Sequence, residues 1–106
     1  MPAGFVRVAK ASDLPERRCR KFAVGDEQIA LWRVGGRFYA VSDFCAHQHA
    51  PTIHRGMLSG LTVTCPLHGW TFSLETGAAE TGDGRLRTFR VLVEDDAVYV
   101  EDPAAG

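Results

Sequence analysis

Two cysteines and two histidines in this 106-residue chain have the types and spacing of metal ligands. Cys45 and His47 form a Cys-x-His pair, and Cys65 and His68 form a Cys-x-x-His pair. Thiolate and imidazole groups are the usual protein ligands of zinc and of iron–sulfur clusters. The spacing therefore predicts a metal centre held between two loops, each of which supplies one cysteine and one histidine.

Two kinds of centre fit this ligand set. A 2Fe–2S cluster has two irons, and one of them can take two thiolates while the other takes two imidazoles. Neutral imidazoles leave such a site less negative than four thiolates do, so the cluster accepts an electron more readily. A single zinc ion can instead take all four side chains in a closed, structural site. The four residues alone leave both readings open.

The composition excludes several other classes of function. The net charge is −1 at pH 7 and there is no long run of one sign, so we expect neither a nucleic-acid-binding nor a membrane-binding surface. No apolar run reaches the roughly 18 residues of a membrane-spanning helix, and the N-terminus lacks the pattern of a signal peptide. We therefore expect a cytoplasmic protein. There are three cysteines, an odd number, so they cannot all pair, and metal ligation is favoured over disulfides.

Short β-type runs separated by turn residues must position the four ligands. Strands are expected at residues 5–8, 20–24, 28–34, 37–41, 57–58, 61–64, 71–74, 86–93 and 97–100. Gly35-Gly36 predicts a tight hairpin, and residues 12–15 predict a turn or one helical turn capped by Ser12. The absence of a long helical pattern predicts one antiparallel all-β domain, a sandwich or a barrel, over residues 1–106. The aromatic side chains expected in its core are Trp32, Phe38, Tyr39, Phe72 and Phe89.

The two ligand pairs fall in two loops, at residues 42–56 and 65–70, and each loop follows an expected strand. Loops as long as the first are often functional in compact domains. We expect residues of about 44–76 to form a small inserted subdomain that holds the two loops tip to tip.

Longer motifs around the ligands resemble the Rieske family. Cys45-Ala46-His47 and Cys65-Pro66-Leu67-His68-Gly69-Trp70 are similar to its two cluster-binding boxes. Asp13-Leu14-Pro15, residues 37–41 and residues 72–77 resemble bacterial Rieske ferredoxins, so the likeness covers about residues 5–100. The resemblance implies a Rieske-type sandwich or barrel that binds one 2Fe–2S cluster. It implies that Cys45 and Cys65 hold the inner iron and that His47 and His68 hold the outer iron near the surface.

The resemblance also places this chain within the family. Respiratory Rieske proteins carry two further cysteines that tie the loops together, and the matching positions here are Ala50 and Leu67. They also place a serine and a tyrosine where this chain has Trp70 and Phe72. Fewer hydroxyl donors to the cluster sulfurs leave the reduced state less stable, which implies a potential at the low end of the Rieske range, about −150 mV.

Three further residues are of ligand type but are expected to play no part in the site. His49 and His54 lie in the first loop and are interpreted as exposed histidines. Cys19 has no histidine near it in the sequence and is interpreted as an incidental thiol.

The resemblance implies an electron carrier rather than an enzyme. The chain is too short for the second iron domain of a Rieske oxygenase, and it has no dinucleotide-binding glycine motif. The leading hypothesis is the ferredoxin component of an aromatic-ring dioxygenase, which receives electrons from a reductase and passes them to an oxygenase. The alternatives are the small subunit of a nitrite reductase-like enzyme, a structural zinc module that binds other proteins, and a redox or iron sensor.

Overall fold

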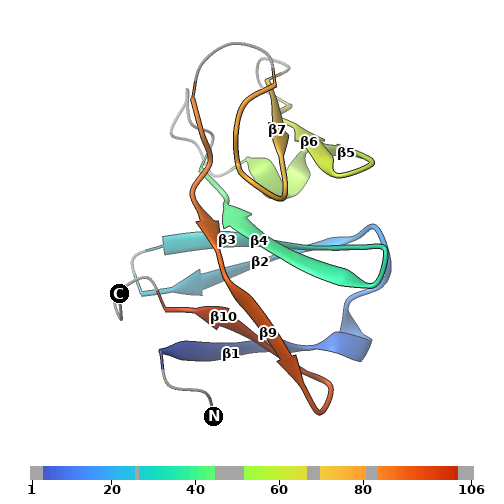
Figure 1. Cartoon of the computed structure of the whole chain (residues 1–106), viewed down its shortest axis with the longest axis vertical. Coiled ribbons are helices and arrows are strands. Elements are labelled where there is room, and N and C mark those ends of the chain that lie inside the picture. The colour runs from blue at the N-terminus through green and yellow to red at the C-terminus, as the bar shows by residue number, and fades with distance from the viewer. Residues whose placement is uncertain (1–3, 26, 45–51, 67–69, 81–83, 103–106) are drawn as a thin grey trace.

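The computed structural model describes residues 4–25, 27–44, 52–66, 70–80 and 84–102, and these residues form three antiparallel sheets (Figure 1). The first sheet has the order β1-β10-β9, the second β2-β3-β4-β8 and the third β5-β6-β7. The strands are β1 (Phe5–Lys10), β2 (Cys19–Val24), β3 (Glu27–Val34), β4 (Arg37–Ser42), β5 (Met57–Ser59), β6 (Thr62–Thr64), β7 (Thr71–Ser73), β8 (Thr88–Phe89), β9 (Val91–Glu94) and β10 (Ala97–Glu101). The prediction of an antiparallel all-β fold is confirmed.

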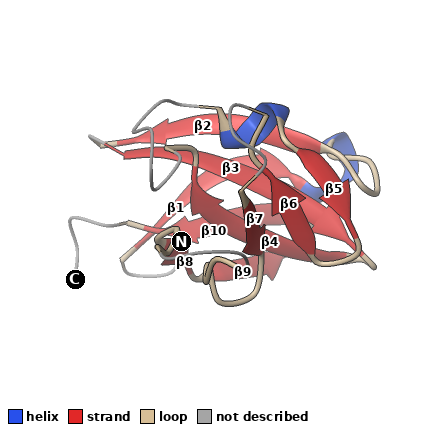
Figure 2. Ribbon diagram, turned by 90° about the horizontal axis from the view of Figure 1, so that it is seen from above, coloured by secondary structure: helices blue, strands red, loops and turns tan. Residues whose placement is uncertain are grey.

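Helical structure in the described part of the chain is limited to two single 3-10 turns. These are η1 (Ala11–Asp13) and η2 (Ile53–Arg55). No helix among the described residues is long and apolar enough to cross a membrane. Seen from above, η2 lies next to β2 at one side of the molecule (Figure 2).

The central strand β3 is buried on both faces, and this sets the layering of the molecule. Ile29 and Leu31 pack with Val98 and Val100 in a core between the first two sheets. On the opposite face, Ala30 and Trp32 belong to a second core. The other buried members of that second core are Val41, Ile53, Val63, Cys65, Phe72, Leu74 and Leu86. The third sheet therefore stands on the second one, at one end of the long axis (Figure 1).

The predicted hairpin at Gly35-Gly36 is confirmed. Both glycines have positive φ, 62° and 78°, a backbone conformation that residues other than glycine rarely adopt. The carboxylate of Glu16 accepts hydrogen bonds from both of their backbone N–H groups. The bond from Gly36 and then that from Gly35 lower the pKa of Glu16 below its ordinary value.

Three expectations about the elements need correction. The strand predicted at residues 86–93 is divided at Arg90, because Phe89 pairs with Ala40 of the second sheet whereas Val91 pairs with Val100 of the first. Ser12 is no helix cap, since its N–H and hydroxyl both donate to the carboxylate of Asp96. The first loop also contains the helical turn η2.

The expected aromatic core is confirmed in part. Trp32, Phe72 and Phe89 are buried. Phe38 and Tyr39 are half-buried and pack against the edges of the two cores.

A glycine at the end of the turn that follows β7 gives a testable prediction. Gly77 has φ +79°, and a Cβ built there would lie 2.0 Å from the backbone oxygen of Leu86. Left-handed backbone costs a residue with a side chain about 1–2 kcal/mol, and forced overpacking costs about 1–3 kcal/mol more. We expect Gly77→Ala to destabilise the protein by about 3 kcal/mol, measured as a shift of the urea unfolding midpoint.

Gly36→Ala is the matched control. Gly36 has nearly the same φ, +78°, but a Cβ there would meet nothing within 4 Å. It should cost only about 1 kcal/mol, the conformational part of the effect. Equal midpoints for the two variants would contradict the close approach between Gly77 and Leu86.

Candidate metal centre

The second ligand loop starts at Cys65, immediately after β6. The Cys65 side chain is fully buried, and its backbone N–H donates to the Trp70 carbonyl at 2.7 Å. On the strand side of this bond, the last residue of β6 is Thr64 and the first residue of β7 is Thr71, and their hydroxyls lie 3.1 Å apart. These contacts close the base of the loop between β6 and β7, so Cys65 is held by the sheet. This placement confirms that the second box directly follows a strand.

The first ligand loop leaves the end of β4, and Asp43 fixes its base. The backbone N–H of Asp43 donates to the carbonyl of Gln28 at 2.8 Å, which extends the pairing with β3. Its carbonyl accepts from the N–H of Ile53 at 3.1 Å, where the chain returns. Both ends of the loop that carries Cys45 and His47 are therefore joined through one residue.

The side chain of Asp43 forms a buried pair with His54. The carboxylate has no solvent exposure, while the His54 side chain is 27% exposed. The backbone N–H of His54 donates to Oδ1 at 2.6 Å, and its ring Nδ1 lies 2.9 Å from each carboxylate oxygen. An ionised carboxylate only accepts hydrogen bonds, so toward an ionised Asp43 the ring donates through an Nδ1 that carries the proton. The interpretation of His54 as a plain surface residue is wrong, since it is a half-buried partner of a buried acid.

Thr52 connects the two loops. It is 6% exposed, and its Oγ1 lies 3.4 Å from the Sγ of Cys65. Asp43, Thr52 and His54 were not recognised in the sequence as parts of one arrangement. The signals there are weak: an acid at the end of an apolar strand and a threonine before a loop histidine.

The other three predicted ligands, Cys45, His47 and His68, lie outside the described residues, as do His49, Ala50 and Leu67. Within the described ranges, no group of three or more His, Cys, Asp or Glu side chains gathers to hold a metal ion. The ligand set therefore stays a prediction. The structure places Cys65 directly after β6, at the start of the second loop.

The surroundings of Cys65 suit an iron–sulfur ligand. Its sulfur belongs to the apolar core that also contains Trp32, Val63 and Phe72, so water is kept from that side. The fully buried Phe72 presents only an apolar ring, and Trp70 is half-buried against the same core. A buried sulfur with a neighbouring hydroxyl fits a thiolate ligand of a cluster, because hydrogen bonds to sulfur and exclusion of solvent both tune such centres.

Cys19 differs from Cys65 in its chemistry. It is half-buried against the same core. Burial raises the pKa of its thiol, and the carboxylate of Asp43 raises it further. Since the thiolate is the form that binds metals, these surroundings disfavour Cys19 as a ligand.

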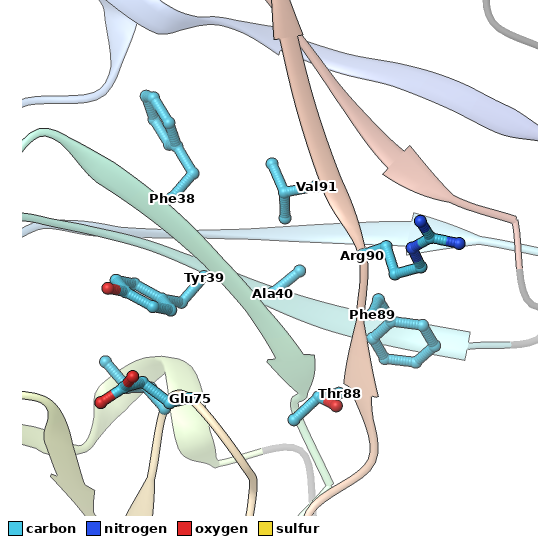
Figure 3. A pocket seen from close by; sticks show the side chains of 9 residues that line it. Phe38, Tyr39, Ala40, Glu75, Thr88, Phe89, Arg90 and Val91 are labelled. Carbon is cyan, nitrogen blue, oxygen red and sulfur yellow. The ribbon is translucent and has the colours of Figure 1, made fainter.

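A separate hollow of about 290 Å³ lies where β4 meets β8 and β9. Figure 3 shows Phe38 and Tyr39 on one side of it and Phe89 and Arg90 on the other. None of the nine described residues that line it is a cysteine or a histidine, so we treat it separately from the candidate metal centre.

Comparison with known proteins gives a family match over most of the chain. Residues 4–90 match the model of the Rieske [2Fe-2S] domain. The chain is 36% identical over 99 residues to the ferredoxin CarAc of Metapseudomonas resinovorans, which covers 91% of this chain and 92% of that one.

Solved structures of the same fold come from two settings. One is the complex of reduced oxygenase and oxidized ferredoxin in carbazole 1,9a-dioxygenase, in which the similar chain is 34% identical with a TM-score of 0.86. The alignment covers 95% of both chains. Another is described as a nitrite reductase NADPH small subunit, at 26% identity and a TM-score of 0.84, and it covers 91% of this chain and 96% of that one.

Proposed function

This chain belongs to the Rieske [2Fe-2S] domain family, and we propose that it carries electrons from a reductase to the terminal oxygenase of an aromatic-ring dioxygenase system. A domain of this family binds one 2Fe–2S cluster, so the chain is a 2Fe–2S electron carrier. The observation that carries the proposal is the 36% identity to a ferredoxin across nine-tenths of both chains. A chain of a solved oxygenase–ferredoxin complex, aligned over 95% of its length at 34% identity, supports the proposal further.

The proposed ligands are Cys45 and Cys65 for one iron and His47 and His68 for the other. When bound, the cluster supplies a site that takes up and releases one electron at a time. The chain's own residues then have three tasks. Cys65 buries its sulfur in the apolar core, and Asp43 joins the ends of the first loop. The backbone hydrogen bond from Cys65 to Trp70 closes the base of the second loop. This arrangement keeps water from the inner side of the centre.

The proposed carrier has no catalytic site of its own and acts in the cytoplasm. The curated relatives that support this role are named as a ferredoxin and as ferredoxin subunits of a dioxygenase. The small subunit of a nitrite reductase-like enzyme is the second candidate, supported by the 26% identical structure. The higher identity to dioxygenase ferredoxins favours the first.

The purified protein tests the proposal directly. We expect a red-brown protein that contains iron and sulfide, whose visible absorption bleaches with dithionite. Trp70 and Phe72 offer no hydroxyl to the cluster, so a redox titration should give a midpoint at the low end of the Rieske range, about −150 mV. A colourless protein with one zinc ion would establish the structural zinc module instead, and a clearly positive midpoint would contradict the assignment to the low-potential type.

The carrier role has its own measurement. The genes beside this one indicate which oxygenase to purify, and the reduced protein is then mixed with that oxygenase in the absence of oxygen. We expect the oxygenase cluster to become reduced while this protein is oxidised. A cluster-bearing protein that gives up no electrons to the oxygenase would point to the sensor or the nitrite reductase-like role.

A further inference from the structure

We propose that Thr52 donates a hydrogen bond to the cluster-ligand sulfur of Cys65 and thereby raises the reduction potential, and that Asp43 and His54 hold Thr52 in place for this task. The inference rests on the proposed function, because it takes Cys65 as a ligand of the cluster. It adds a hydroxyl donor from the first loop to a site in which Trp70 and Phe72, in and after the second box, offer no hydroxyl.

The direction of the hydrogen bond follows from the state of the sulfur. Oγ1 of Thr52 and Sγ of Cys65 are 3.4 Å apart, and in a free thiol either atom could donate. A cysteine that ligates iron is a thiolate and has no proton to give. In the loaded protein the hydroxyl of Thr52 must therefore be the donor of this bond and the sulfur the acceptor.

Such a bond stabilises the reduced state more than the oxidised one. Reduction adds a negative charge to the cluster, and the ligand sulfurs share it, so a donor at the sulfur gains strength. Thr52 is 6% exposed and Cys65 is fully buried, and electrostatic interactions are less screened away from water. The Thr52 hydroxyl thus raises the reduction potential, as hydroxyl groups at positions 70 and 72 would if this chain had them there.

The segment that carries Thr52 is fixed on one side by Asp43. Ile53 donates its N–H to the Asp43 carbonyl, and His54 bonds the Asp43 carboxylate through both its backbone and its ring. The carbonyl of Thr52 in turn accepts the N–H of Arg55 at 3.0 Å. Thr52 therefore directly precedes the turn η2, and the first two residues of that turn are hydrogen-bonded to the buried Asp43.

The same segment is packed tightly against β6 on its other side. A Cβ built on Gly56 would lie 2.6 Å from Cγ2 of Val63 and 2.7 Å from the carbonyl oxygen of Thr64. Only a residue without a side chain lets the two segments approach this closely. Since Thr64 directly precedes Cys65, this contact sets the separation between the Thr52 hydroxyl and the sulfur.

The experiment compares Thr52→Val, which removes the hydroxyl but keeps the shape, with Thr52→Ser, which keeps the hydroxyl. We expect the valine variant to shift the one-electron equilibrium about tenfold toward the oxidised form, a midpoint about 59 mV lower. The serine variant should stay near the wild-type midpoint. Thr62→Val is the matched control, because it removes a hydroxyl of β6 that donates to the carbonyl of Ser59 at an exposed site, and it should leave the midpoint unchanged.

A second readout detects the hydrogen bond itself. The iron–cysteine stretching bands in the resonance Raman spectrum should shift on transfer of the wild-type protein into deuterium oxide, and replacing threonine by valine should reduce that shift. A fully loaded valine variant with the wild-type midpoint would overturn the proposal. If that variant fails to hold its cluster, a wild-type protein without a deuterium shift would overturn it in the same way. A wild-type protein without a cluster would instead overturn the proposed function and this inference with it.

Discussion

A Cys65→Ser variant should be isolated almost free of iron and sulfide, with the visible absorption of the wild-type protein lost. Cys65 is fully buried directly after β6, and among the described residues no group of three or more His, Cys, Asp or Glu side chains gathers that could hold a metal in its place. Changing groups that merely support a metal ligand lowers metal affinity by about 10–100-fold, and removal of the ligand itself should do at least as much. The measurement is iron and sulfide per chain, together with the visible spectrum.

The same loss is expected when Cys45, His47 or His68 is replaced singly, since each is a proposed ligand. Cys19→Ser provides the matched control. Cys19 is a second cysteine against the same core, but burial raises the pKa of its thiol and disfavours the metal-binding form. That variant should keep a full cluster. A full cluster after replacement of any of the four proposed ligands would contradict the ligand set.

Replacing Asp43 by alanine should destabilise the protein by about 3 kcal/mol. The change leaves the backbone N–H and the ring Nδ1 of His54 without the carboxylate that accepts them. Each buried polar group that loses its partner costs about 1–3 kcal/mol, and the partial exposure of His54 reduces the ring's share. For a domain of this size, about 3 kcal/mol corresponds to a fall of about 12 °C or more in the unfolding midpoint. The midpoint should be compared at one fixed scan rate, because the midpoint of a protein that unfolds irreversibly depends on the scan rate.

Two further variants test whether the loss of stability comes from breaking the Asp43–His54 pair or from removing any acidic residue. Asp96→Ala removes a carboxylate that also accepts two hydrogen bonds, both from Ser12, but at an exposed site. It should cost about 1 kcal/mol or less. His54→Ala combined with Asp43→Ala should be less harmful than the sum of the two single changes, because neither partner is then left alone. An Asp43→Ala variant as stable as wild type would contradict the role given to this carboxylate.

The sequence predicted those parts of the fold that depend on neighbours along the chain. The Gly35-Gly36 hairpin follows from two residues that tolerate positive φ, and the structure has it. Apart from the run at residues 86–93, the alternating runs located the described strands within a few residues, since side-chain alternation is a local property of extended backbone. Cys65 could be placed at the start of a loop for the same reason, because a predicted strand ends at the residue before it.

The parts that the sequence did not predict depend on contacts between distant residues. Asp43 and His54 are eleven positions apart, and nothing in either residue shows that the acid is buried. Thr52 and Cys65 meet because Gly56 lets their segments approach, a packing detail with no pattern in the sequence. The division of residues 86–93 at Arg90 likewise follows from which sheet accepts each half, because the run itself reads as one continuous strand.

The double-sided burial of β3 limits which substitutions this chain can accept. Most strands at a sheet surface have one side on which almost any polar residue is tolerated, but positions 29–32 have no such side. A larger side chain at Ala30 would press on the core beneath the metal centre, whereas a change at Ile29 or Leu31 would open the core between the first two sheets. In random mutagenesis, these four consecutive positions should therefore accept very few substitutions in variants that still fold. The exposed residues of β2, on the edge of the same sheet, should vary freely.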